Sequence, residues 1–420
     1  MSHPFTRREL LVRSGALAAG SLFLAGTGRG FAANQQRTQS STAGRGKSQT
    51  PLLIVVYLRG GADFLNMVIP YEDKAYRQMR PTIAVGADEG AIPLGRTGFA
   101  LHPAMAELLP LWNAKALAPV VCTGSPHSTR SHFDAQDFME RGAPGLRNVT
   151  TGWLNRYLQA TAEPDGSIFR ALAVQGLLPR SLRGEFPALA VPKGLEQGKG
   201  ESTLNEFEDL YGGGDAEDLG VTDVVGSGYA TIETLRRLQE ILDDAEIDRR
   251  AGYPNSPFGR RMQTIAALAD AECGLEIAAV DYTGWDHHTE QGGVEGRQAP
   301  MLADYSKSIA AFAKQLGPRI SSTLIVTMTE FGRNVAENGN SGTDHGRGSG
   351  MLLVGGKTRG GEVHGRWKGL GTRELIDGRD LPITTDFRDV MSTCLESHLD
   401  FKLPRDFFPG HKVKRVKLFG

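Results

Sequence analysis

The sequence predicts an α/β fold built on a mostly parallel, doubly wound sheet. Short apolar runs alternate with longer segments whose apolar residues recur at the helical period of 3.6. This alternation is typical of a parallel sheet, because each parallel connection needs a crossover that is usually a helix. Three of the apolar runs end in side chains that bind metal ions. Because ligands of open α/β sheets lie beyond the carboxyl ends of the strands, we expect a functional site at that edge.

Residues 1–33 have the pattern of an export signal rather than of a folded segment. Arg7 and Arg8 precede a short, weakly apolar core at 16–25, and small residues at 30–33 offer a cleavage site. The apolar core is shorter than the ~20 residues that span a bilayer. The pattern resembles a twin-arginine signal, which predicts the twin-arginine export machinery as a partner and a periplasmic or secreted protein. An ordinary secretory signal or an uncleaved anchor is the alternative.

The rest of the chain divides into a linker and one large unit. Residues 34–50 are polar and predict a disordered linker, whereas 51–420 suit one large α/β domain or two smaller ones, of which we expect the first. Within it, 196–227 are rich in Gly, Asp and Glu and are interpreted as a surface insertion. No second apolar stretch predicts a stable transmembrane segment in the mature chain. The net charge is −1 without a basic patch, which gives no argument for nucleic acid binding.

Apolar runs predict the strands, and periodic segments with caps predict the helices. The expected strands are 52–58, 118–123, 171–174, 188–191, 275–280, 323–328 and 350–356. The expected helices are 73–79, 103–114, 131–141, 153–160, 229–247, 258–272, 300–316 and 386–399. Ser131 is a natural N-cap and Gly142 a natural stop for the helix between them.

The first candidate ligand is Asp63, which follows the first strand after two glycines. Gly60 and Gly61 give the loop the freedom to bring a carboxylate close to a metal ion. The alternative is that Asp63 caps a turn.

The segment after the second strand offers a nucleophile. Ser131 and Thr129 are hydroxyl residues at the start of a predicted helix, where the positive end of the helix dipole favours an alkoxide and binds anionic oxygens. Arg130, between them, is suited to bind a phosphate or sulfate through two hydrogen bonds. The alternative is that Ser131 only caps the helix and Arg130 forms a surface ion pair.

The remaining candidates follow the 275–280 and 323–328 strands. Asp286 and His288 lie two residues apart, so an extended segment turns both to one side, where they could bind Zn²⁺. Glu330 ends the later strand, and Asp344 and His345 follow in a glycine-rich loop. Asp344 is either a ligand or the residue that orients the His345 ring. A solvent-exposed loop is the alternative for the Asp286 segment.

At these residues the chain resembles a family of bacterial, twin-arginine-exported proteins known as a domain of unknown function, DUF1501. The family is grouped with the alkaline phosphatase and sulfatase clan. The segments that carry the resemblance are LRGGAD (58–63), TRSHFDAQ (129–136), GWDHH (284–288), TEFGR (329–333), TDHG (343–346) and DFRD (386–389). The resemblance extends from about residue 52 to the C-terminus.

The resemblance implies an αβα sandwich like that of alkaline phosphatases and sulfatases, with one or two divalent metal ions, commonly zinc. By the clan's order of motifs, the metal ligands fall at Asp63, Asp286, His288, Glu330, Asp344 and His345. The nucleophile falls at Ser131 or Thr129. Two positions depart from the clan: Phe331 stands where the clan has a histidine, and Glu330 replaces an aspartate. One metal site would therefore lack a ligand.

Two functions remain open. The leading hypothesis is an exported, metal-dependent hydrolase of small anionic esters of phosphate or sulfate, with Arg130 binding the anion. The alternative, supported by Phe331, is a non-catalytic envelope protein that uses a degenerate metal site for binding or assembly. A redox protein is disfavoured, because the chain has neither a dinucleotide-binding glycine motif after its first strand nor a cysteine cluster.

Overall fold

The computed structural model describes residues 50–164, 166–192, 222–244 and 251–420, together with Leu195, Ser202, Leu204 and Asn205. The predicted export signal, all but the last residue of the predicted linker and most of the predicted insertion lie outside the described residues. Within the described part, no helix combines the length and the apolar character that crossing a membrane requires.

The centre of the molecule is an eight-stranded sheet. In spatial order its strands are β11 (Thr385–Asp386), β5 (Leu117–Gly124), β10 (Ser349–Gly355), β9 (Thr323–Met328), β1 (Leu52–Arg59), β8 (Ile277–Thr283), β6 (Ala171–Ala173) and β7 (Leu189–Ala190). Every neighbouring pair is parallel except the two pairs that include β10, which is antiparallel to β5 and β9. The prediction of a mostly parallel sheet is confirmed.

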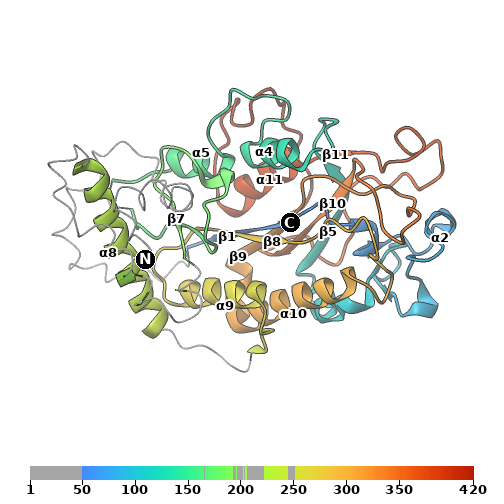
Figure 1. Cartoon of the computed structure of the whole chain (residues 1–420), viewed down its shortest axis with the longest axis horizontal. Helices are drawn as coiled ribbons and strands as arrows, with labels where there is room; N and C mark the ends of the chain where they lie inside the picture. Colours follow the sequence, from blue (N-terminus) through green and yellow to red (C-terminus); the bar gives the residue numbers. More distant parts are fainter. Residues whose placement is uncertain are drawn as a thin grey trace, which may run out of the picture.

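Helices cover both faces of this sheet (Figure 1). One layer contains α4 (His132–Arg141), α5 (Trp153–Ala160) and α11 (Phe387–His398), and the other contains α9 (Pro257–Asp270) and α10 (Gln298–Leu316). The long helix α8 (Thr222–Asp244) contacts α9. The structure is therefore the expected αβα sandwich.

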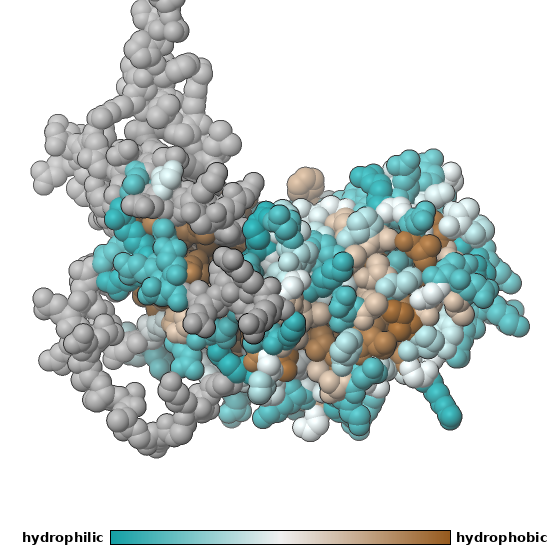
Figure 2. Space-filling model, turned by 90° about the horizontal axis from the view of Figure 1, so that it is seen from below, coloured by the Kyte–Doolittle hydropathy of each residue, from teal (hydrophilic) through white to brown (hydrophobic). Residues whose placement is uncertain are grey.

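Strand β1 shows why the sheet needs two helical layers. Its side chains alternate between two hydrophobic cores, with Ile54 and Val56 in the core of α9 and α10 and Leu53 and Val55 in the core of α5 and α11. Seven of its eight residues are buried, so the run is apolar throughout rather than alternating with polar residues. Figure 2 shows the α9 and α10 side, where hydrophilic and apolar side chains are interspersed.

The predicted helix at 103–114 is wrong as a single helix. The segment forms the 3₁₀ helix η3 (Pro103–Leu108), with Met105 outside helical geometry, and then the short α3 (Leu109–Asn113). Pro110 explains the break, because proline has no N–H for a helix interior but is accepted in the first turn of a new helix.

The remaining elements are a small second sheet and several short helices. The antiparallel strands β2 (Val68–Ile69), β4 (Ala100–Leu101) and β3 (Ile92–Pro93) form a second sheet. The short helices are α2 (Lys74–Met79), η1 (Phe64–Asn66), η2 (Ala87–Glu89), η4 (Arg180–Leu182) and η6 (Gly317–Ser322).

Candidate metal centre

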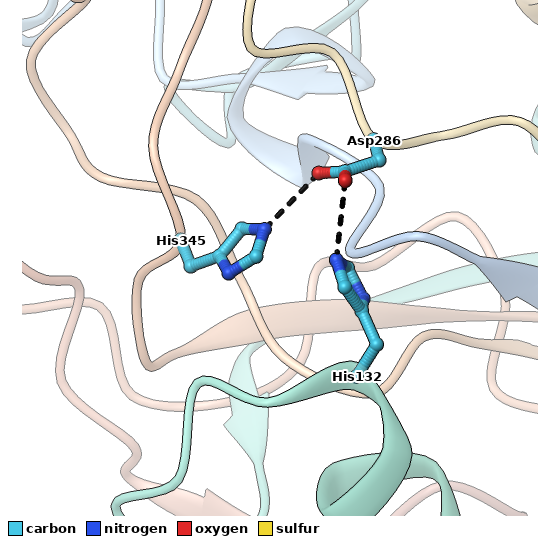
Figure 3. Close-up of side chains that lie close together, drawn as sticks. All are labelled: His132, Asp286 and His345. Carbon is cyan, nitrogen blue, oxygen red and sulfur yellow. Dashed lines mark hydrogen bonds and ion pairs between the residues drawn. The ribbon is translucent and has the colours of Figure 1, made fainter.

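Four side chains converge beyond the carboxyl ends of the parallel strands. His132 is the first residue of α4, which follows β5. Asp286 and His288 lie on the loop after β8, and His345 lies on the loop between β9 and β10. Figure 3 shows His132 and His345 pointing toward the Asp286 carboxylate from two different elements.

The converging atoms are separated by about the length of a hydrogen bond. Asp286 Oδ1 lies 3.1 Å from Nε2 of His288 and 3.1 Å from Nε2 of His345. The two Nε2 atoms are 2.9 Å apart. Asp286 Oδ2 lies 3.3 Å from Nε2 of His132. Every imidazole therefore presents the same ring nitrogen to one carboxylate.

The opposite ring nitrogens fix where the protons are. Nδ1 lies 2.8 Å from Glu330 Oε1 in His132, 3.2 Å from Asp344 Oδ1 in His288, and 2.9 Å from the Arg130 carbonyl oxygen in His345. A carbonyl or carboxylate oxygen only accepts, so each Nδ1 must carry the proton. In a neutral ring, Nε2 then holds a free electron pair.

This arrangement fits a divalent metal ion. Two electron pairs that face each other at 2.9 Å repel unless a cation or a proton lies between them. A tetrahedral zinc site with bonds of about 2.0–2.1 Å separates its ligand atoms by about 3.3 Å, close to the distances observed here. His132 Nε2 is also buried, and no described group forms a hydrogen bond with it. Imidazole nitrogens with a carboxylate oxygen are ligands that zinc accepts.

The charges at the site are set by neighbouring side chains. Partial burial alone would raise the pKa of Asp286, but the hydrogen bond from Arg333, the contact with His345 and the Arg333 charge outweigh it and hold the pKa at about 2. Burial lowers the pKa of His345. The hydrogen bond to Glu330 raises the pKa of His132. When no cation is present, His132 therefore takes up a proton more readily than His345. At neutral pH Asp286 is therefore an anion and His345 is neutral, the forms that bind metals.

Two predicted ligands instead lie behind the imidazoles. Glu330 is 1% exposed and accepts hydrogen bonds from the Gly60 N–H and from Gln136, as well as from His132. These hydrogen bonds outweigh the effect of burial and lower the pKa of Glu330. Asp344 accepts from His288 and not from the adjacent His345. Carboxylates in this position fix the orientation of ligand histidines and increase their basicity.

Asp63 is not part of the cluster. Its two carboxylate oxygens lie 2.5 and 3.0 Å from the Arg80 guanidinium, and both side chains are buried. Gln291 donates to Asp63 as well, at 2.6 Å, and accepts a hydrogen bond from Thr343. Asp63 therefore connects η1 to the loops that carry the histidines.

The predicted catalytic segment lies against the cluster. Ser131 is exposed at the N-cap position of α4, and its side chain makes no capping hydrogen bond. The residues on either side contact the site, Arg130 through its carbonyl oxygen and His132 through its ring. The Thr129 hydroxyl accepts the Ser131 N–H at 3.2 Å. The Arg130 guanidinium donates to Asp380 at 2.6 Å, while its side chain is 40% exposed.

Close backbone packing and an aromatic ring hold the loops in place. A Cβ at Gly60 would lie 2.6 Å from the Asp286 nitrogen, and one at Gly342 would lie 2.3 Å from the His288 carbonyl carbon. The Phe331 ring packs against two of the imidazoles, with centroids 4.8 Å from His132 and 4.7 Å from His345. Phe331 therefore forms an apolar wall of the site.

Sequence reasoning did not assign two of these residues. His132 follows Ser131 directly. Its position in the first turn of a helix that follows a strand indicates that it lies at the same edge of the sheet as the other ligands. Arg333 is buried and donates to Asp286 at 2.6 Å and to backbone carbonyls, including that of Thr343 at 2.9 Å. His287 is 3% exposed and lies in the interior, where burial lowers its pKa to about 4.

Comparison with known sequences identifies one family. The sequence model of the family described as "Protein of unknown function (DUF1501)" matches residues 116–406. No curated protein matches the chain.

Solved structures are similar over most of the chain at low scores. The phosphonate monoester hydrolase SpPMH from Silicibacter pomeroyi has a TM-score of 0.35 and 13% identity, covering 86% of this chain and 77% of that one. The PsFucS1 sulfatase from Pseudoalteromonas sp. has a TM-score of 0.36 and 11% identity, covering 88% and 74%. At these scores the similarities carry no argument about activity.

Proposed function

We propose that this chain, which belongs to the DUF1501 family of unknown function, is a metal-dependent hydrolase of phosphate or sulfate esters. The observation that carries the proposal is the convergence of His288, His345 and Asp286, whose ligand atoms lie 2.9 to 3.1 Å apart. Each imidazole is held by an acceptor on its far nitrogen, as in metal sites that are built to keep one tautomer.

The reaction is hydrolysis at phosphorus or sulfur. A side-chain hydroxyl bonds to that atom and gives up its proton to the leaving oxygen, whose own bond to phosphorus or sulfur breaks, so that it departs as an alcohol. Water then bonds to the same atom and returns one proton to the side-chain oxygen as the bond to that oxygen breaks, and the water oxygen leaves in the phosphate or sulfate product. A bound divalent ion would supply a positive charge that polarises the ester and stabilises the charge of the transition state. Asp286, His288 and His345 would hold this ion.

Ser131 is the residue we assign as nucleophile. Its hydroxyl is exposed, lies at the N-terminus of α4 and has a neighbour on each side in contact with the cluster. The Thr129 hydroxyl accepts the Ser131 N–H and is already engaged in this turn. The helix N-terminus favours the anionic form of a hydroxyl oxygen, and the exposed part of Arg130 is available to an anionic ester.

Hydrolysis is tested with the purified mature protein and a panel of phosphate and sulfate esters, with and without added zinc, manganese or calcium. We expect metal-dependent turnover that falls at least ~100-fold in Ser131→Ala, the scale of an essential group. His127→Gln, on the same segment, is the matched control and should retain activity. A metal-loaded protein that turns over none of these esters would contradict the proposal.

A second candidate is a non-catalytic binding protein of the cell envelope. The observation that favours it is Phe331, which packs an apolar ring against both His132 and His345. This candidate predicts tight binding of an anion at the loaded centre, measured by calorimetry, without release of alcohol.

Export is the remaining part of the proposal, and it rests on the sequence alone. Replacing Arg7 and Arg8 with lysine should leave the folded protein in the cytoplasm, because the paired arginines are the feature that identifies the signal. Cell fractionation with immunoblotting measures this. Export of the double variant at the normal level would point to an ordinary secretory signal.

A further inference from the structure

We infer that the centre binds one divalent metal ion through His132, Asp286, His288 and His345, and that the Arg80 guanidinium neutralises Asp63 in place of a second ion. The inference rests on the metal requirement in the proposed function and goes beyond it in naming the ligands and the stoichiometry.

His132 completes the ligand set. Its Nε2 atom is buried, has no hydrogen-bond partner among the described groups and lies 3.3 Å from Asp286 Oδ2. The ligand atoms of His132, Asp286 and His345 all lie within 4.8 Å of one another. The Glu330 carboxylate holds the far side of the His132 ring at 2.8 Å, just as Asp344 and the Arg130 carbonyl hold the other two rings. In all three histidines an acceptor oxygen therefore holds the proton on Nδ1 and leaves Nε2 free to bind the ion.

Both carboxylate oxygens of Asp63 already accept hydrogen bonds. Arg80 binds both of its oxygens, and Gln291 donates to one of them as well. The same guanidinium donates to the Val335 carbonyl at 2.7 Å and to Asn66 at 2.7 Å, so it is held in place from several sides. A metal ion at Asp63 would lie against a fixed positive charge in a buried region, where repulsion between like charges is strong.

Glu330 is occupied in a similar manner. Its Oε1 atom accepts from the Gly60 N–H at 2.9 Å, from Gln136 at 2.9 Å and from His132 at 2.8 Å. Arg333 places a second buried guanidinium beside Asp286, at 2.6 Å. Arg80 and Arg333 thus place fixed positive charge beside Asp63 and Asp286, so less negative charge remains for a second ion to balance.

Metal stoichiometry tests the inference without any activity assay. The full mature protein is saturated with Zn²⁺, desalted and analysed by elemental mass spectrometry, and affinity is measured by calorimetry. We expect one zinc per chain in the wild type and in Asp63→Asn. His132→Ala should bind zinc at least ~10-fold more weakly and should change the visible spectrum of bound Co²⁺. The matched control His127→Gln should change neither. Thermal unfolding in chelator shows that each variant is folded.

Each outcome is decisive. Two zinc ions in the wild type with one in Asp63→Asn would overturn the inference, as would unchanged zinc affinity in His132→Ala. A protein that binds no zinc, manganese or calcium would overturn the inference and the proposed function together. One ion per chain without ester turnover would support the inference and would contradict only the hydrolase proposal.

Discussion

Asp63 and Asp286 occupy equivalent places in the sequence pattern but have different roles. Each follows a buried parallel strand, and each lies against a buried arginine, Arg80 in one case and Arg333 in the other. Asp63 is 1% exposed and gives both oxygens to its arginine, whereas 42% of the Asp286 side chain is exposed and its arginine binds only Oδ1. A strand end brings a carboxylate to the functional edge, but its partners decide whether it remains available as a ligand.

The largest expected effect is a loss of folding stability when the ion pair at Asp63 is broken. Replacing Arg80 with methionine leaves the Asp63 charge buried and unpaired, which should lower the free energy of unfolding by about 3–5 kcal/mol. Urea unfolding measures this. A loss below ~1 kcal/mol would mean that water or another cation reaches Asp63, and the distinction between the two carboxylates would fail.

Asp286→Asn should have the opposite profile. We expect zinc affinity to fall at least ~100-fold, more than the loss typical of residues behind the ligands, because the amide is a poor metal ligand. The unfolding free energy in chelator should fall by about 1–2 kcal/mol, less than in Arg80→Met, because the buried Arg333 loses its carboxylate partner but Asp286 itself is partly exposed. Calorimetry and urea unfolding of the same preparation separate the two quantities. Equal losses of stability in Asp286→Asn and Arg80→Met would contradict the comparison.

Gly60 connects the two regions and should show an intermediate effect. Its φ is +122°, and a Cβ would lie 2.6 Å from the Asp286 nitrogen. Gly60→Ala should therefore cost about 1–3 kcal/mol of stability and move Asp286, which weakens zinc binding as well. Gly95→Ala is the matched control, because Gly95 also has a positive φ but nothing lies within 4 Å of its added Cβ. Zinc affinity that stays unchanged in Gly60→Ala would show that the loop adapts.

The smallest effect is expected at Arg77, in the short helix α2 that Arg80 directly follows. Arg77 forms an ion pair with Glu89 at 2.6 Å, but its side chain is 53% exposed. Exposed pairs of this kind contribute about 0–1 kcal/mol, so Arg77→Met should barely change urea unfolding. A loss as large as that of Arg80→Met would show that burial is not what distinguishes the two arginines.

The sequence predicted the sheet better than the connections between side chains. Apolar runs such as 52–58 and 323–328 identify buried strands because both faces of the sheet are covered. The break at Pro110 was missed, since the apolar spacing of 103–114 continues across the point where the helix restarts. Periodicity reports which residues face the core and not whether the backbone hydrogen bonds continue.

The site shows the same limit. The structure brings Asp286, His288 and His345 together, as the strand-end pattern predicts. It places Glu330 and Asp344 behind the rings, where each accepts the Nδ1–H of a histidine. The sequence does not predict this, because a carboxylate can bind either a metal ion or the Nδ1–H of a ligand histidine. The pairing of Asp63 with Arg80 depends on how α2 packs against η1, which no local motif encodes.

The converging residues also determine when the centre can form. Because synthesis runs from the N-terminus, His132 is made first, Asp286 and His288 follow, and His345 is the last of the four. A nascent chain that lacks the loop between β9 and β10 therefore cannot complete the cluster, and the full ligand set forms only after that loop has been made. The metal that is loaded depends on the ions available in the compartment where folding finishes. If the chain is exported already folded, that compartment is the cytoplasm, and export carries the chosen ion outward with the protein.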